Sequence, residues 1–70
     1  MPRGVTIVLN GEGFEAPPGS TVLSLLESMG VAAARVAVEL NGRVVRRDDF
    51  PRVPIREHDK VEVVHFVGGG

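Results

Sequence analysis

Val36-Ala-Val-Glu-Leu-Asn-Gly-Arg-Val-Val45 is the stretch of sequence that does most to decide the fold. Apolar residues alternate with others up to Leu40, which predicts a strand with one buried face. Asn41-Gly42 is the strongest short indication of a hairpin, because both central residues of a type I′ turn need positive φ. Arg43–Val45 then predicts the return strand. Residues 36–45 are therefore expected to form a β-hairpin.

The residues before this hairpin predict an amphipathic helix. Ser20 or Thr21 can cap the first free N–H groups with a side-chain oxygen. Apolar residues then follow at helical spacing and share one face: Val22, Leu25, Leu26 and Met29. Gly30 supplies the left-handed position that ends a helix. Residues 31–35 are expected to connect the helix to the hairpin, with a helical turn among them.

Two further segments at the ends of the chain predict strands. Residues 5–10 are rich in β-branched side chains, residues 10–13 form a turn cluster, and residues 14–16 predict a short return strand. Residues 46–57 are polar and interrupted by prolines, so they predict a loop whose apolar residues tuck beneath the core: Phe50, Val53 and Ile55. After a turn at His58-Asp59, residues 60–66 predict the last strand.

The order hairpin, helix, hairpin, loop, strand predicts an α+β domain with a helix on one face of a sheet. The first and last strands are expected to pair in parallel at the centre, through a right-handed crossover. This is a β-grasp (ubiquitin-like) arrangement: a mixed sheet of about five strands packed on one main helix. We expect a single domain over residues 1–66, followed by a flexible reactive tail over residues 67–70.

Length and composition restrict the function. A chain of 70 residues has room for one core, because domains of this size bury only about 60% of their unfolded surface. There is no cysteine, which rules out disulfides and thiol chemistry on side chains. A net charge of −1 argues against nucleic acid as a partner. No apolar run approaches a signal peptide or a membrane span, so we expect a cytoplasmic protein. We also expect the protein to be monomeric when free.

The polar residues predict no metal site and no self-contained active site. His58 and His65 are the only histidines, and two histidines without cysteine do not make a structural zinc site. Asp48-Asp49 lies beside two arginines and is expected to form a solvated, charged loop. The sequence therefore does not predict an enzyme.

The ending Gly68-Gly69-Gly70 is different, because the only reactive group it can present is the α-carboxylate of Gly70. A free α-carboxyl group is ionised at neutral pH. Because glycine has no Cβ, a glycine segment can pass through a narrow channel and adopt any φ. Such a carboxylate can attack an activated phosphate, and the acyl adenylate that results can be opened by a sulfur nucleophile. The alternative is an ordinary frayed chain end.

The last predicted strand also suggests a surface for a partner. Alternation places Val64 and Phe66 on the face opposite the helix and close to the tail, with Val8 on the same face. Exposed apolar residues grouped in this way indicate a docking patch. The alternative is that they are single surface hydrophobes, which are common.

These segments together resemble the ThiS family of sulfur carriers, over essentially the whole chain. The resemblance is carried by four stretches: residues 7–11 (Ile-Val-Leu-Asn-Gly), 21–26 (Thr-Val-Leu-Ser-Leu-Leu), 36–42 (Val-Ala-Val-Glu-Leu-Asn-Gly) and 63–70 (Val-Val-His-Phe-Val-Gly-Gly-Gly). The Gly-Gly ending is common to all ubiquitin-like carriers, whereas the complete ending and the short length are more specific. The chain departs from the pattern in a slightly longer N-terminus and a third tail glycine.

The resemblance implies a protein co-substrate of thiamine (thiazole) biosynthesis with no bound cofactor. A ThiF-type enzyme would use ATP to adenylate Gly70, and sulfur derived from a cysteine desulfurase would convert it to a thiocarboxylate. Thiazole synthase, ThiG, would accept that sulfur. Gly70 would be the reactive residue, and the partner-binding residues would be Val64, Phe66, Val67, Gly68 and Gly69.

Three other functions remain open from the sequence. Relatives with the same fold and tail carry sulfur for molybdopterin, tRNA thiolation or cysteine synthesis. A ubiquitin-like modifier would instead be conjugated through Gly70 to lysines of target proteins. A purely structural interaction domain would have an inert glycine tail.

Overall fold

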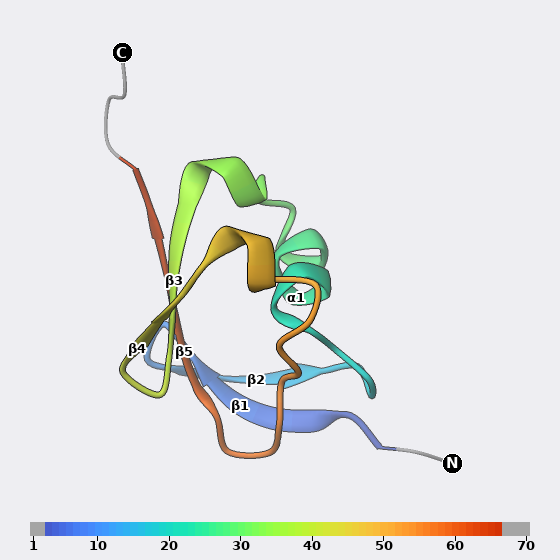
Figure 1. Cartoon of the computed structure of the whole chain (residues 1–70). Helices are drawn as coiled ribbons and strands as arrows, with labels where there is room; N and C mark the ends of the chain where they lie inside the picture. The colour runs from blue at the N-terminus through green and yellow to red at the C-terminus, as the bar shows by residue number, and fades with distance from the viewer. Residues whose placement is uncertain (1–2, 67–70) are drawn as a thin grey trace.

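The structure, a computed structural model, describes residues 3–66 (Figure 1). The expectations for Val67, Gly68, Gly69 and Gly70 therefore lie outside the described residues. The described part contains five strands, one α-helix and two short 3₁₀ helices. In chain order these are β1 (Val5–Leu9), β2 (Glu12–Ala16), α1 (Val22–Met29), η1 (Ala33–Arg35), β3 (Val36–Leu40), β4 (Arg43–Val45), η2 (Arg47–Asp49) and β5 (Lys60–His65).

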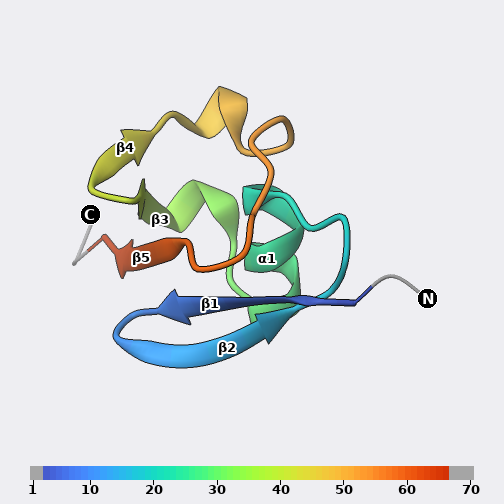
Figure 2. The ribbon, with the colours of Figure 1, turned by 90° about the horizontal axis from the view of Figure 1, so that it is seen from below.

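The five strands form one mixed sheet in the order β2-β1-β5-β3-β4. Strands β1 and β5 pair in parallel, and every other neighbouring pair is antiparallel. The sheet curls around α1, which lies against one of its faces (Figure 2). The predicted β-grasp arrangement, with the first and last strands side by side, is confirmed.

Both hairpins turn at an Asn-Gly pair with positive φ at each residue. The φ angles are 50° and 84° at Asn10 and Gly11, and 52° and 84° at Asn41 and Gly42. These angles fit the type I′ turn, which matches the twist of the flanking strands. The predicted four-residue turn over residues 10–13 was too long, because two residues suffice and Glu12 already pairs with Leu9.

Helix α1 begins and ends at the predicted signals. The Thr21 hydroxyl accepts a hydrogen bond from the Ser24 N–H, and the Ser24 hydroxyl oxygen accepts one from the Thr21 N–H, which makes a reciprocal cap. Ser20 is not the cap, since its buried hydroxyl donates to the Pro17 carbonyl. Gly30 closes the helix with a φ of 75°.

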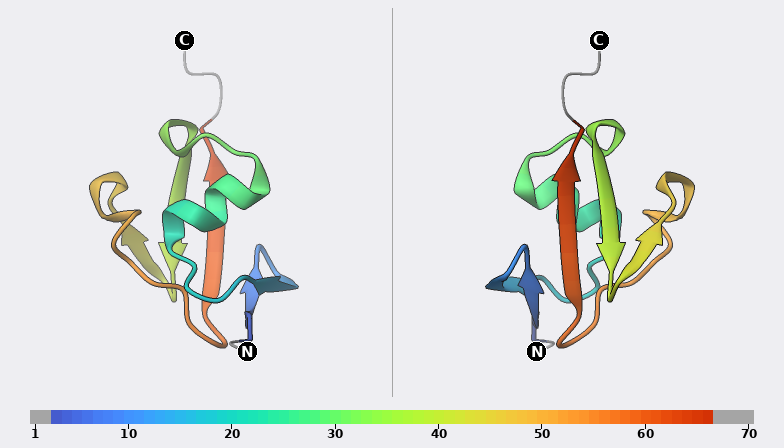
Figure 3. Two further views of the ribbon diagram at one scale, coloured as in Figure 1. Left: turned by 90° about the vertical axis from the view of Figure 1, so that its right-hand side faces the viewer. Right: turned by 90° about the vertical axis from the view of Figure 1, so that its left-hand side faces the viewer.

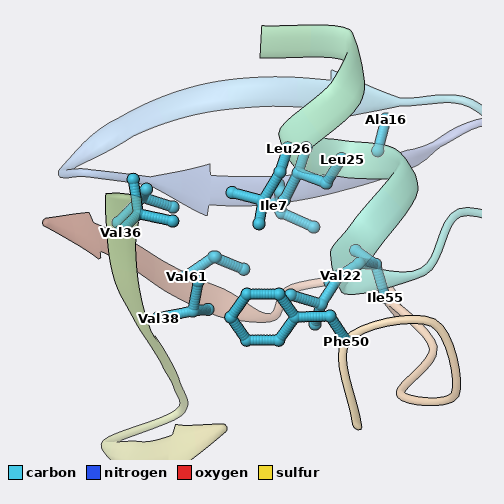
Figure 4. Close-up of a cluster of buried hydrophobic side chains, with 11 residues drawn as sticks. Ile7, Ala16, Val22, Leu25, Leu26, Val36, Val38, Phe50, Ile55 and Val61 are labelled. Carbon is cyan, nitrogen blue, oxygen red and sulfur yellow. The ribbon is translucent and has the colours of Figure 1, made fainter. Parts of the chain in front are cut away.

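One hydrophobic core lies between α1 and the sheet (Figure 4). Val22, Leu25 and Leu26 contribute the buried face of the helix, while Met29 is only partly buried. The sheet and the loops supply the remaining buried residues: Ile7, Ala16, Val36, Val38, Phe50, Ile55, Val61 and Val63. Phe50 and Ile55 come from the predicted loop, and Val53 packs against the cluster, so the expectation that these three lie beneath the core is confirmed.

The long loop between β4 and β5 also holds the start of the helix. The N–H groups of Val22 and Leu23 donate to the carbonyls of Val53 and Phe50, both at 2.9 Å. These are two of the N–H groups that the first turn of a helix leaves without a partner inside the helix. The loop therefore serves as a second cap.

Candidate partner-docking surface

The sheet face turned away from α1, called here the open face, carries exposed apolar side chains. Figure 3 shows this face in its right-hand view, with β5 and β3 in front of the helix. The large apolar residues exposed in the described part of the chain are Val8, Val44, Val64 and Phe66. Val64 and Phe66 keep 61% and 57% of their surface, so their predicted exposure is confirmed.

Val64 and Phe66 belong to a small apolar group at the C-terminal end of β5. Val64 lies directly opposite Ala37 of β3, which is also exposed. The last strand was predicted to end at Phe66, but β5 ends at His65. Phe66 is therefore the first residue after the strand. Ala37, Val64 and Phe66 are called the docking patch below. Ala37 was not predicted, although the alternation that buries Val36 and Val38 already places it on the open face.

The other two exposed valines lie farther along the sheet. Val8 pairs with Lys60 at the start of β5, and the charged side chain of Glu62 separates that position from Val64. Val44 lies opposite Glu39 on the edge strand β4 and is 73% exposed. Val44 was not predicted from the sequence, although the two-residue turn at Asn41-Gly42 sets the register that places it opposite Glu39.

Two carboxylates border the docking patch. Glu39 and Glu62 are directly opposite each other on β3 and β5, and both are exposed. Like charges in this position destabilise a sheet. The one ion pair among residues 3–66 lies elsewhere and joins Arg52 to Asp49 at 3.9 Å. The open face therefore combines an apolar patch with neighbouring negative charge.

Hydrogen bonds on both sides hold β5 up to the last described residue. On the β1 side, Asn10 Oδ1 accepts from the Val63 N–H at 2.8 Å, and Asn10 Nδ2 donates to the Val63 carbonyl at 3.3 Å. On the β3 side, the Phe66 N–H donates to the Arg35 carbonyl at 2.9 Å. The position from which residues 67–70 continue is therefore defined by the folded domain.

The predicted histidine and aspartate positions do not converge on a site. His58 lies exposed in the turn before β5 with a φ of 68°, and His65 is exposed at the end of β5. Asp49 makes the exposed ion pair with Arg52. Within residues 3–66, no group of three or more His, Cys, Asp or Glu side chains is placed to hold a metal ion. That part of the chain also has no helix long and apolar enough to cross a membrane.

Comparison with known proteins decides the family. The model of the ThiS family matches residues 4–70, which is nearly the whole chain. The chain belongs to the ThiS family. The match includes the three terminal glycines and the docking patch, so the resemblance seen in the sequence is confirmed.

Individual relatives agree with this assignment. The sulfur carrier protein ThiS of Thermus thermophilus is 42% identical over 62 residues, which cover 89% of this chain and 95% of that protein. The crystal structure of the thiamine biosynthesis protein ThiS of Geobacter metallireducens superposes with a TM-score of 0.80 at 35% identity. It covers 94% of this chain and 100% of that one. The β-grasp fold described above is thus the fold of a known ThiS protein.

A second group of relatives is much longer than this chain. Thiazole synthase of Magnetococcus marinus is 48% identical over 64 residues, which are 91% of this chain but 20% of that protein. Thiazole synthase of Paramagnetospirillum magneticum is 39% identical over the same length and share. The chain therefore spans about a fifth of the length of these relatives.

Proposed function

We propose that this chain is a sulfur carrier of thiamine biosynthesis that serves as a protein co-substrate and not as an enzyme. The observation that carries the proposal is the match of the ThiS family model through Gly70, at the end of a domain whose last strand is firmly held. Curated relatives of similar length bear the name sulfur carrier protein ThiS, which supports the same function. The consumption of ATP in the first step is in keeping with a cytoplasmic location.

The chemistry takes place on the α-carboxylate of Gly70. A ThiF-type enzyme transfers AMP from ATP to the carboxylate and releases pyrophosphate. A persulfide derived from a cysteine desulfurase displaces AMP and leaves an acyl disulfide. A second thiol then attacks this disulfide, so that the Gly70 thiocarboxylate is released and a new disulfide remains behind. Gly68 and Gly69 suit passage through an enzyme's channel, because they present no side chain.

Thiazole synthase is the proposed acceptor of the sulfur. Two proteins of that name contain a stretch that resembles this chain, and a carrier sequence joined to its acceptor supports a partnership between the two. The docking patch supplies the contact surface, with Val64 and Phe66 as the main apolar side chains and Val67 next to them in sequence. Burying such side chains at an interface contributes about 25 cal/mol for each Å² of apolar surface removed from water.

Intact-mass measurement tests the carrier chemistry. The chain is incubated with the adenylating enzyme, ATP and a sulfur donor, and the expected product has one oxygen replaced by sulfur. A matched chain with a peptide tag fused after Gly70 keeps the domain but has no carboxylate at that residue, so it should keep its mass. An unchanged mass of the untagged chain, under conditions that thiolate a known carrier, would contradict the proposal.

Deletion of Gly70 tests the role of the terminal residue without altering the folded domain. We expect the shortened chain to fold as before and to lose sulfur transfer to thiazole synthase. Transfer that survives the deletion would remove Gly70 from the mechanism. Isopeptide adducts of the chain on lysines in cell extracts would instead favour a protein modifier.

A further inference from the structure

The side chain of Asn10 takes the place of a piece of β1 that is missing from the sheet. The parallel ladder between β1 and β5 runs as far as the Asn10 N–H, which donates to the Val61 carbonyl at 2.9 Å. The chain then turns away at Gly11 to begin the hairpin. Because β1 has turned away, no backbone group of β1 is available to the N–H and carbonyl of Val63, the next residue of β5 that points to this side. The Asn10 carboxamide supplies the missing partners, one acceptor and one donor, as a peptide group would.

This contact lies at the end of β5 that leads to the reactive tail. Only two residues, Val64 and His65, separate Val63 from Phe66. The Phe66 N–H donates from the other side of β5 to the Arg35 carbonyl. Beyond Leu9, β1 contributes no further residue to the sheet, so Asn10 is the last support on the β1 side. The two contacts together set the direction in which β5 leaves the domain.

We propose that Asn10 is a positioning residue for the transfer reaction: its carboxamide aims the end of β5 so that Gly70 reaches the partner's active site while the docking patch is seated. The inference rests on the proposed function of Gly70. Its physical basis is that a displacement of about 1 Å from a productive geometry can lower a rate roughly a hundredfold. Val64 and Phe66 stand on the same short segment, so loosening it changes the relation between the patch and the tail.

Asn41 provides a matched control within the same chain. It occupies the equivalent position of the second hairpin, with a φ of 52°, and it also bridges to β5. Its Oδ1 accepts from the Lys60 N–H at 2.9 Å and its Nδ2 donates to Asp59 Oδ1 at 3.0 Å. These bonds lie at the start of β5, away from the tail. The two asparagines make similar contacts, and only Asn10 is near the end that carries Gly70.

The test compares Asn10→Gly with Asn41→Gly, since glycine keeps the positive φ and removes only the carboxamide. The assay measures kcat and KM for thiolation of the chain by the adenylating enzyme and a sulfur donor. We expect Asn10→Gly to lower kcat about tenfold or more with KM within about twofold, since misplacement acts on the reacting geometry. We expect Asn41→Gly to leave both constants within about twofold of the unsubstituted chain. Asn10→Asp keeps an acceptor for the Val63 N–H and should give an intermediate kcat.

Hydrogen exchange at the amides of residues 63–66 provides a readout that does not depend on activity. Faster exchange at these amides is expected in Asn10→Gly and not in Asn41→Gly.

Two outcomes would overturn the inference. Equal losses of kcat in the two glycine variants would show that Asn10 only stabilises the domain, and an unchanged kcat in Asn10→Gly would show that its carboxamide does not position the tail. If the unsubstituted chain is not thiolated at all, the proposed function fails. Exchange at residues 63–66 would then still show whether the Asn10 carboxamide holds the end of β5 in place.

Discussion

Glu39 and Glu62 lie directly opposite each other on the neighbouring strands β3 and β5, so that two negative charges face one another at the centre of the open face. Cross-strand pairs of opposite charge contribute about 0.2–1 kcal/mol to a sheet, and like charges act against it. We therefore predict that Glu62→Lys raises the free energy of unfolding by roughly 0.5 kcal/mol. Urea denaturation at low salt measures the change, which should shrink at high salt.

Glu12→Lys is the matched control for this change. Glu12 is also an exposed strand glutamate, but its cross-strand partner is Leu9, so no like-charge repulsion is removed. An equal gain in the free energy of unfolding in both variants would mean that stability responds to net charge and not to the Glu39–Glu62 pair.

The repulsion between Glu39 and Glu62 also agrees with a binding role for the open face, because unfavourable local arrangements in a fold are found most often at functional sites.

Gly30 is required by backbone geometry and not by space. Its φ is 75°, and a Cβ built there meets no atom within 4 Å. A residue with a Cβ in the left-handed region costs about 1–2 kcal/mol, so Gly30→Ala should lower the free energy of unfolding by about 1 kcal/mol. Gly13→Ala is the control, since Gly13 is equally uncrowded and its φ lies outside the left-handed region. A loss at Gly13 as large as at Gly30 would contradict this explanation.

Removal of the ring should destabilise the domain strongly at Phe50 and hardly at all at Phe66. Phe50 is 2% exposed and fills the core from a loop, so Phe50→Ala should cost about 3–5 kcal/mol. A chain of this length has a total stability of roughly 4–10 kcal/mol, and this variant should be partly unfolded at room temperature. Phe66→Ala should change stability by less than about 0.5 kcal/mol, because the ring is 57% exposed. Thermal denaturation by circular dichroism compares the two, and a strong loss with Phe66→Ala would contradict the assignment.

Much of this fold could be predicted because its strongest signals are local. The Asn41-Gly42 turn, the capped helix and the alternation of β5 each depend on neighbouring residues, and each is found where expected. The parallel pairing of β1 with β5 followed from topology, since the helix and a hairpin lie between them.

The features that were missed depend on contacts between distant residues. The bond between Asn10 and Val63 joins positions 53 residues apart, and a turn asparagine gives no sign that its side chain also extends a ladder. The repulsion between Glu39 and Glu62 likewise requires the register of β3 on β5. Alternation along β5 did predict the exposure of Val64, but not that Glu62 separates it from Val8.

Val64 provides the most direct test of the docking patch. It is 61% exposed opposite Ala37, so Val64→Asp should change the free energy of unfolding by less than about 1 kcal/mol. At an interface the same carboxylate would be buried against apolar side chains, which is costly for an unpaired charge. We predict at least a tenfold loss of affinity for thiazole synthase, or about 1.4 kcal/mol, measured by isothermal titration calorimetry. Val44→Asp is the control, because Val44 is 73% exposed on the same face but outside the patch. If both variants bind as tightly as the unsubstituted chain, the partner is seated elsewhere; if both lose affinity equally, the interface extends across the open face to β4.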